Sequence, residues 1–362
     1  MGALSPTGLC ERSIKMCSIS ATGKILEASD KIFLGIGSRQ VIVPNDRKDL
    51  YLAILKEMAE RRGVRVPEHS FSEIPELKGA YEDLLQSGVI SDVDTTNFNS
   101  QDVTYKTKLY IESLPLDSKK VEEAAQSTTV LILGCGGIGN QVAYSLASSP
   151  VSNIVLVDGD IVEESNLNRQ FLFSRKDLGF SKASVLKERL NELRPELNIT
   201  CISEYASRES IEQILEQIGV SAVAIISADS RGILKSICPS LMKAGVPFLN
   251  VGYLNDISII GPFWTSKNDA CPFCGNRLGI EAGAARDSFS AFFDAYEAPS
   301  CMVNNSFAGA MAVSDLFNFW SGDLNRVVSL NKRIGLVNPT FNRVEISLNR
   351  DPMCAVCGFL ER

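Results

Sequence analysis

Residues 128–142, TTVLILGCGGIGNQV, combine a short apolar run with a glycine-rich turn and the start of a helical pattern. Gly134, Gly136 and Gly139 form the spacing G-x-G-x-x-G, and Gly137 lies inside it. Glycines at these positions allow a tight turn and a close approach of backbone N–H groups to phosphates, and the helix N-terminus adds a favourable dipole. The stretch therefore predicts a strand, turn and helix that bind a nucleotide in a Rossmann-like domain.

A carboxylate follows the next predicted strand. The stretch NIVLVD ends at Asp158, nineteen residues after Gly139. An acid at this distance is placed to accept hydrogen bonds from ribose hydroxyls. The glycine turn and Asp158 suit NAD as well as ATP, so they predict a nucleotide site without deciding which nucleotide it binds.

The residues beyond Asp158 favour ATP. Asp160 is followed by the stretch NLNRQ, which contains Arg169, and then by Lys182 in GFSK. A dinucleotide site has no need of an Arg and a Lys that converge beyond the second strand, whereas the pyrophosphate leaving ATP carries developing negative charge. The alternative is that these are unrelated surface charges, which their order along the chain disfavours. The predicted ATP-binding residues are Gly134, Gly136, Gly137, Gly139, Asp158, Asp160, Asn166, Arg169, Gln170 and Lys182.

A second acid, Asp229, ends the predicted strand AVAIISAD at the same carboxyl edge of the sheet. Mg²⁺ prefers oxygen ligands and bridges carboxylates to phosphates. The sequence thus predicts that Asp229 binds Mg²⁺ and that it acts in catalysis together with Arg169 and Lys182.

Two C-x₂-C hooks lie far apart in the chain. Cys271 and Cys274 form CPFC, and Cys354 and Cys357 form CAVC, with 79 residues between the hooks. Each hook has the spacing of half a tetrahedral Cys₄ zinc site. Four thiolates leave no coordination position open, which favours structural zinc that closes a long loop. A pair of redox-active C-x-x-C motifs is the alternative, and it explains the two pairs less well.

Three regions differ in their pattern. Residues 1–95 predict short strands followed by two or three helices, an α+β unit with the size and order of a winged-helix-like domain. Residues 96–127 are polar and predict a linker arm. Residues 128–362 alternate apolar runs with helical patterns, which is typical of a mostly parallel α/β sheet buried on both faces.

Composition excludes several function classes. Of the 362 residues, 45% are hydrophobic, enough for a sizeable core, and the net charge of −7 with scattered Lys and Arg argues against nucleic acid. No apolar run approaches the roughly 20 residues that span a bilayer, and the first residues lack a signal peptide pattern, so we expect a cytoplasmic protein without membrane contact. The single histidine, His69, excludes multi-His metal centres, and its position in the loop-like stretch PEHSF disfavours a Ser-His-Asp triad.

The motifs GCGGIG, D-x-D, N-x-N-R-Q, the downstream lysine and S-A-D stand in the order seen in E1-like adenylating enzymes, and residues 128–362 resemble this ThiF/MoeB family. The stretches NLNRQFLFS and SLNKRIG and the final C-x-x-CG resemble its MccB/PaaA-type branch, which modifies ribosomally made precursor peptides. The C-x₂-C pairs fit the same family.

The resemblance implies a homodimeric Rossmann-like adenylation domain in which Asp158 holds ribose, Arg169 and Lys182 contact phosphates beside Gln170, and Asp229 binds Mg²⁺. It implies that ATP adenylates a carboxylate of the peptide and that an internal nucleophile then displaces AMP. The product is a cyclised or dehydrated peptide, as in peptide antibiotic biosynthesis. The N-terminal domain would hold the leader of the precursor peptide at a strand edge.

One element departs from the family pattern. Family members usually carry R-[YF]-x-R in the arm, where this chain has VTYKTK with Lys106 and Lys108. Lysine neutralises a phosphate but lacks the bidentate fork of arginine, so either a lysine substitutes or the contact with the partner subunit's ATP is weaker. The residues that we expect around the acyl group are Tyr253, Asn255, Asp256, Asn304 and Asn305.

Other functions remain open at this point. An activating enzyme for a ubiquitin-like or sulfur-carrier protein would adenylate a C-terminal Gly-Gly and could use Cys301 as a thioester-forming residue. A scaffold that binds peptide without catalysing a reaction is disfavoured, because the charged residues Asp158, Arg169, Lys182 and Asp229 are all present. An enzyme that uses a nicotinamide cofactor is a further alternative, and a measurement of cofactor binding would identify it.

Overall fold

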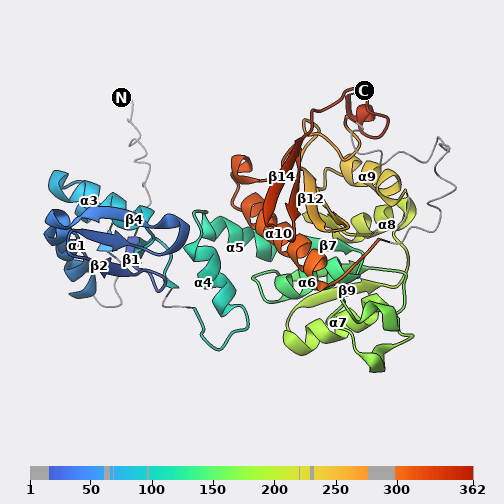
Figure 1. The fold of residues 1–362 in the computed structure, drawn as a ribbon, viewed down its shortest axis with the longest axis horizontal. Coiled ribbons are helices and arrows are strands. Elements are labelled where there is room, and N and C mark those ends of the chain that lie inside the picture. The colour runs from blue at the N-terminus through green and yellow to red at the C-terminus, as the bar shows by residue number, and fades with distance from the viewer. Residues whose placement is uncertain are drawn as a thin grey trace, which may run out of the picture. The chain divides into compact units, whose positions relative to one another are not determined.

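The computed structural model of the chain describes residues 16–60, 66–67, 69–95, 98–219, 221–228, 232–275 and 298–361. The chain divides into two compact units, Met1–Ser118 and Lys119–Arg362 (Figure 1). No helix in the described part is long and apolar enough to cross a membrane.

The first unit holds two small antiparallel sheets and four helices among its described residues. One sheet has the strand order β5-β1-β6, and the other has the order β2-β3-β4. The elements of this unit are β1 (Met16–Ile19), β2 (Ile25–Glu27), β3 (Lys31–Leu34), β4 (Val41–Pro44), α1 (Lys48–Glu60), β5 (Val66–Pro67), α2 (His69–Ser72), α3 (Pro75–Gln86), β6 (Ile90–Ser91) and α4 (Tyr105–Ser113).

Periodic apolar residues explain the helices of this unit. Ile54 and Met58 of α1 and Tyr81 and Leu84 of α3 are buried in one core cluster with the strands. The helix α3 ends at Gln86, and Gly88 just beyond it has a φ of +72°, the left-handed conformation that glycine favours after a helix. The unit is therefore the small α+β domain that the sequence predicts.

The second unit is built on an eight-stranded sheet of order β14-β13-β12-β11-β10-β7-β8-β9. Its five strands from β11 to β9 are parallel to one another, and β12 to β14 continue the sheet antiparallel. The elements are α5 (Ser118–Ser127, which starts at the last residue of the first unit), β7 (Thr129–Leu133), α6 (Gly137–Ala147), β8 (Asn153–Val157), α7 (Lys182–Leu193), β9 (Asn198–Ile202), α8 (Arg208–Ile218), β10 (Ala222–Ile226), α9 (Ile233–Lys243), β11 (Phe248–Leu254), β12 (Ile257–Trp264), α10 (Met302–Trp320), β13 (Lys332–Val337) and β14 (Asn342–Ser347).

Helices cover both faces of this sheet, which is why its central strands are apolar throughout. Leu131 and Leu133 of β7 share a buried cluster with α8 and α9. Since successive strand residues point to opposite faces, Val130 and Ile132 face the other side, where α6 packs against α10 (Figure 1). The predicted α/β fold with a mostly parallel sheet is confirmed; the three antiparallel strands were not predicted.

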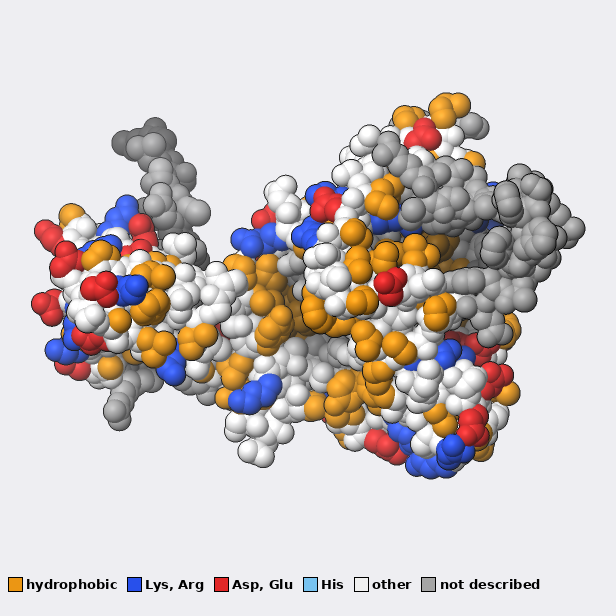
Figure 2. Space-filling model, viewed as in Figure 1, with side chains coloured by type: hydrophobic (Ala, Val, Ile, Leu, Met, Phe, Trp, Pro, Cys, Tyr) orange, Lys and Arg blue, Asp and Glu red, His pale blue; other side chains and the backbone are white. Residues whose placement is uncertain are grey.

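Charges are mixed on the surface. On the described part of the face in Figure 2, Lys and Arg side chains alternate with Asp and Glu. That face therefore shows none of the clustered positive charge that a nucleic-acid footprint requires.

Candidate active site

A cavity of about 720 Å³ lies at the carboxyl ends of the parallel strands β7, β8 and β10. Ligands of open α/β sheets bind at this edge, where the order of the strands reverses. Most of the sequence-predicted residues meet here. The predicted residues in its lining are Gly134, Gly136, Gly137, Asp158, Asp160, Asn166, Arg169, Gln170 and Lys182.

The glycine loop leaves no room for side chains at two of its positions. A Cβ atom on Gly139 would lie 2.9 Å from the carbonyl carbon of Gly134, and one on Gly137 would lie 2.7 Å from Cγ of Asn305. Gly134 itself has a φ of +99°, which favours glycine. Gly136 and Gly137 line the cavity at the start of α6. Gly139 does not line it and instead packs against the backbone of Gly134.

Asp158 joins two motifs. Its carboxylate accepts hydrogen bonds from the backbone N–H of Cys135 in the glycine loop at 2.6 Å and from that of Asp160 at 2.8 Å. Burial raises the pKa of Asp158, although these backbone hydrogen bonds and Lys182 oppose the rise. The two backbone donors fix the carboxylate at the end of β8, on the wall of the cavity.

Lys182 is a buried cation with one acidic partner. Its Nζ lies 2.8 Å from Oδ2 of Asp160, and the Lys182 side chain is 8% exposed. The other oxygen of Asp160 accepts a 2.7 Å hydrogen bond from the hydroxyl of Tyr205. Burial alone would raise the pKa of Asp160, but the hydrogen bonds from Lys182 and Tyr205 outweigh it and lower that pKa.

Arg169 and Gln170 follow a short 3-10 helix, Glu164–Asn166. Arg169 donates 2.9 Å hydrogen bonds to the carbonyl of Ser165 and to Oδ1 of Asn168. Gln170 is 2% exposed, and its Oε1 has no hydrogen-bond partner among the described residues. An unpartnered buried acceptor in a cavity wall fits a site whose ligand supplies the missing donor.

Polar groups from β11 and α10 also line the cavity. Asn250 and Tyr253 come from β11, and Asn305 comes from α10. Asn304 does not line the cavity, and its Nδ2 instead donates to the carbonyl of Asn255 at 2.9 Å. The predicted acyl-group residues therefore divide into two that face the cavity and three that do not; Asp256 is also outside the lining.

Tyr205 and Asn250 are among the lining residues that sequence reasoning missed. Tyr205 lies three residues beyond the end of β9, at the same sheet edge as Asp158. The signal that was available is this position after a strand, which the sequence analysis applied to Asp158 and Asp229 but not to the residues after β9. Asp229 lies outside the described residues.

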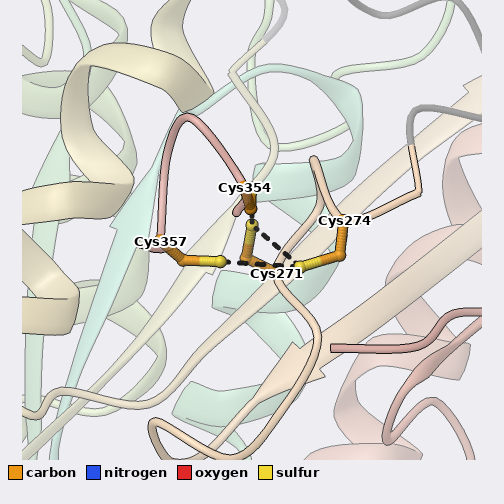
Figure 3. A group of neighbouring side chains, drawn as sticks. All are labelled: Cys271, Cys274, Cys354 and Cys357. Carbon is orange, nitrogen blue, oxygen red and sulfur yellow. Dashed lines mark hydrogen bonds between the residues drawn. The ribbon is translucent and has the colours of Figure 1, made fainter. Parts of the chain in front are cut away.

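The four predicted cysteines form a buried cluster (Figure 3). CPFC follows β12 and CAVC follows β14, so the sheet brings the two hooks together. Neighbouring sulfur atoms are 3.5 to 3.8 Å apart. A disulfide has its sulfurs about 2.05 Å apart, whereas a tetrahedron with Zn–S bonds of about 2.3 Å has edges of about 3.8 Å. The donor set and its geometry are thus consistent with zinc.

Backbone and cationic groups surround this cluster. The N–H groups of Phe273 and Asp351 point at Sγ of Cys271 and Cys274, each at 3.4 Å. The buried guanidinium of Arg333 donates to the carbonyl of Pro272 at 2.6 Å. N–H donors and a nearby cation stabilise thiolate ligands.

Three other predicted residues lie away from the cavity lining. Cys301 is exposed and is the N-cap of α10. Lys106 lies 5.2 Å above the ring of Tyr105, and Lys108 lies 5.8 Å above that of Phe98.

Comparisons with known proteins agree with this architecture. Among curated proteins, the chain is 27% identical to the sulfur carrier protein ThiS adenylyltransferase of Escherichia coli over 173 residues, which are 48% of this chain and 68% of that protein. It is 31% identical to SUMO-activating enzyme subunit 2 of Dictyostelium discoideum over 136 residues, which are 37% of this chain and only 21% of that protein.

Solved structures with a similar fold cover nearly the whole chain. E. coli MccB with ATP is 24% identical with a TM-score of 0.75, over 95% of this chain and 99% of that one. PaaA is 19% identical with a TM-score of 0.65, over 91% and 99%. The ThiF family model matches residues 109–356. The chain therefore belongs to the ThiF family of E1-like, ATP-binding adenylyltransferases.

Proposed function

We propose that this enzyme adenylates a carboxylate of a ribosomally made precursor peptide and so prepares the peptide for cyclisation or dehydration. The observation that carries the proposal is one cavity with two kinds of lining residue. Asp158, Arg169 and Lys182 line it together with Tyr253 and Asn305. A nucleotide and an acyl group bound to these two sets of residues would meet inside the cavity.

The charged residues of the cavity suit the first step, the adenylation of the carboxylate. Asp158 would accept the ribose hydroxyls, and Arg169 and Lys182 would bind the phosphates beside Gln170. An oxygen of the peptide carboxylate attacks the α-phosphorus of ATP, the bond to the bridging oxygen of the β-phosphate breaks, and pyrophosphate leaves. The two cations stabilise the charge that develops on the leaving group. Mg²⁺ would supply further charge, with Asp229 as its proposed ligand.

The second step releases AMP. A nucleophile within the peptide, such as an amide nitrogen, attacks the acyl carbon, and the bond from that carbon to the AMP oxygen breaks. The acyl-adenylate is already activated, so positioning can supply most of the acceleration. This chemistry is compatible with a cavity whose lining contains no histidine among the described residues.

The N-terminal unit offers a surface for peptide. Leu26, Phe33 and Ile42 are cross-strand neighbours in the sheet β2-β3-β4, and we call them the apolar row. Leu26 is 45% exposed and Ile42 is 58% exposed. Among the described residues, β2 and β4 each pair on one side only. We infer that the leader of the precursor peptide adds a strand to this sheet and covers the apolar row.

The same proposal includes the wider assembly. Residues 1–95 would form the peptide-binding domain, 96–127 the arm and 128–362 the adenylation domain of a homodimer. Zinc would hold the hooks after β12 and β14 together as a structural staple. Lys106 or Lys108 would contact the partner subunit's ATP in place of the arginines usual in the family.

E. coli MccB has been solved with MccA and with a succinimide, as well as with ATP. These relatives share the fold, and they motivate the choice of a peptide substrate. The test is peptide-dependent ATP consumption, with short peptides encoded beside this gene as substrates and mass spectrometry of both products. AMP, pyrophosphate and a peptide lighter by whole waters are expected; ATP turnover that no peptide stimulates would contradict the proposal.

A second candidate function is favoured by the similarity to ThiS adenylyltransferase. The enzyme would then adenylate the C-terminal glycine of a small carrier protein, and the exposed Cys301 would be available for a thioester. Pyrophosphate exchange that depends on a Gly-Gly-ended carrier, together with a carrier thioester that forms in the wild type and not in Cys301→Ala, would establish this function instead.

A further inference from the structure

We propose that Tyr205 is a positioning residue that holds Asp160 in place and, through Asp160, aims the amine of Lys182 into the nucleotide cavity. The inference deepens the proposed function, on which its meaning for catalysis rests. Its structural part stands on contacts within this chain.

The Asp160 carboxylate uses one oxygen for each neighbour. Oδ2 accepts from Nζ of Lys182 at 2.8 Å, and Oδ1 accepts from the hydroxyl of Tyr205 at 2.7 Å. The lysine side chain is 8% exposed, whereas that of Asp160 is 46% exposed. If Lys182 were its only partner, the exposed carboxylate of Asp160 would turn freely. The hydrogen bond from Tyr205 therefore decides whether the buried amine of Lys182 has a fixed partner.

The ring of Tyr205 is itself held by a close backbone contact. A Cβ atom on Gly159 would lie 2.7 Å from Cγ of the Tyr205 ring, so the ring lies directly against this glycine. Gly159 stands between the two acids of the D-x-D motif. Although Tyr205 is 65% exposed, its ring rests against this glycine, and its hydroxyl reaches Asp160 from there.

A second tie joins the same loops. Oγ of Ser203, two residues before Tyr205, lies 2.7 Å from Oγ of Ser181 and 3.2 Å from Oγ of Ser184. Ser181 is the N-cap of α7, the helix that begins with Lys182. The serine contacts thus join the loop after β9 to the start of α7, and the Asp160 contacts join the loop after β8 to the same two segments.

Charges around Asp160 favour its ionised form. The groups that face it or its partners are Lys182, Tyr205, Asp158 and Glu163. Lys182 and Tyr205 lower the pKa of Asp160 against the effect of burial. Loss of the Tyr205 hydroxyl would raise that pKa and loosen the ion pair at a higher pH.

The first measurement needs no turnover. The full-length, nucleotide-free protein is labelled with an amine-reactive reagent, and mass spectrometry compares Lys182 with Lys187 of the same helix. In Tyr205→Phe, Lys182 should react about threefold faster than in the wild type, because one hydrogen bond of the network is lost. Asp160→Asn should accelerate it further, and Tyr205→Phe should add nothing in that background. Unchanged labelling in Tyr205→Phe, or additive effects, would overturn the positioning role.

The second measurement concerns ATP. In Tyr205→Phe, the KM for ATP should rise about fivefold while kcat changes less than twofold, since bound phosphates hold Lys182 once the site is filled. Tyr144→Phe is the control, because Tyr144 is 40% exposed and lies outside the cavity lining. An unchanged KM overturns the inference. If the wild-type protein forms no AMP with any substrate, the proposed function is overturned. The labelling of Lys182 still tests the role of Tyr205 in that case.

Discussion

The Asp158 carboxylate accepts a 2.6 Å hydrogen bond from the backbone N–H of Cys135. This contact joins the end of β8 to the glycine loop after β7, two motifs that lie 23 residues apart in the chain. It also uses an acceptor lone pair of a carboxylate whose pKa burial raises. We therefore expect protonation of Asp158 to make nucleotide binding depend on pH.

Lower pH should affect binding and stability in opposite directions. Because the folded-state pKa of Asp158 is above its unfolded value of about 3.9, the folded protein binds more protons between the two values. As pH falls through this window, Asp158 contributes a gain in the free energy of unfolding. Adenosine affinity should fall in the same window, because a protonated oxygen no longer accepts from ribose.

Adenosine is the appropriate ligand because it has no phosphates that titrate. Calorimetric affinities are compared with denaturant unfolding of the nucleotide-free protein over the same pH range. Asp160→Asn should keep the pH dependence, since the pKa of Asp160 is lowered and lies below the window. A pH-independent adenosine affinity would remove Asp158 from the ribose site.

Local motifs made much of this site predictable. The glycine turn, Asp158 and Lys182 combine spacing with a chemical requirement, so the sequence alone predicts that they share a nucleotide site. The two cysteine hooks predict a separate metal site in the same way. Tyr205 was not predictable in this way, because its position depends on the parallel register of β8 and β9, in which Val157 pairs with Ile202.

One of the antiparallel strands, β14, escaped prediction for a related reason. β14 is mostly exposed at the edge of the sheet and has a polar sequence, NRVEIS, so it lacks the apolar run of a buried strand. Its presence follows from the ladder with β13, which only the folded chain reveals.

Lys182→Met should lower kcat for ATP–pyrophosphate exchange by about 100-fold, because it removes a buried cation that would stabilise the leaving group. Methionine keeps most of the apolar length of the side chain, and Asp160 is exposed enough to be hydrated. Lys187→Met in the same helix is the matched control and should stay near wild-type activity. Equal exchange rates for the two variants would show that Lys182 does not act on the phosphates.

The glycine loop allows a matched pair of alanine substitutions. A Cβ atom on Gly136 would have its nearest neighbour 3.7 Å away, whereas one on Gly139 would meet the backbone of Gly134. Gly136→Ala should therefore fold with a Tm within about 2 °C of the wild type, and Gly139→Ala should lose about 5 °C or more. Thermal unfolding followed by circular dichroism makes the comparison, and similar losses in both variants would mean that the close contact at Gly139 is relieved cheaply.

Zinc should be present at about one ion per chain, and its loss should unfold part of the second unit. Cys354→Ser removes one ligand, and we expect a Tm about 10 °C lower together with loss of the metal. Cys201→Ser is the control, because Cys201 is a half-buried thiol outside the cluster. Elemental analysis and thermal unfolding are the measurements; a Cys354→Ser protein with full zinc content and unchanged Tm would rule out the four-thiolate site.

The apolar row of the N-terminal unit should affect peptide binding and leave the nucleotide site unchanged. The double variant Leu26→Glu and Ile42→Glu places two charges on an exposed face, so folding should be little affected. A leader peptide that covers this face would have to desolvate both carboxylates, and its KM should rise by about tenfold or more.

The control for this prediction is Ile74→Glu in the same unit. Ile74 is 41% exposed and precedes α3, away from the sheet β2-β3-β4 in the sequence. Adenosine affinity, which reports only on the nucleotide site, should be the same in the control, the double variant and the wild type. An equal rise in peptide KM for the control would indicate a general effect of added negative charge. An unchanged KM in the double variant would move the peptide site away from the apolar row.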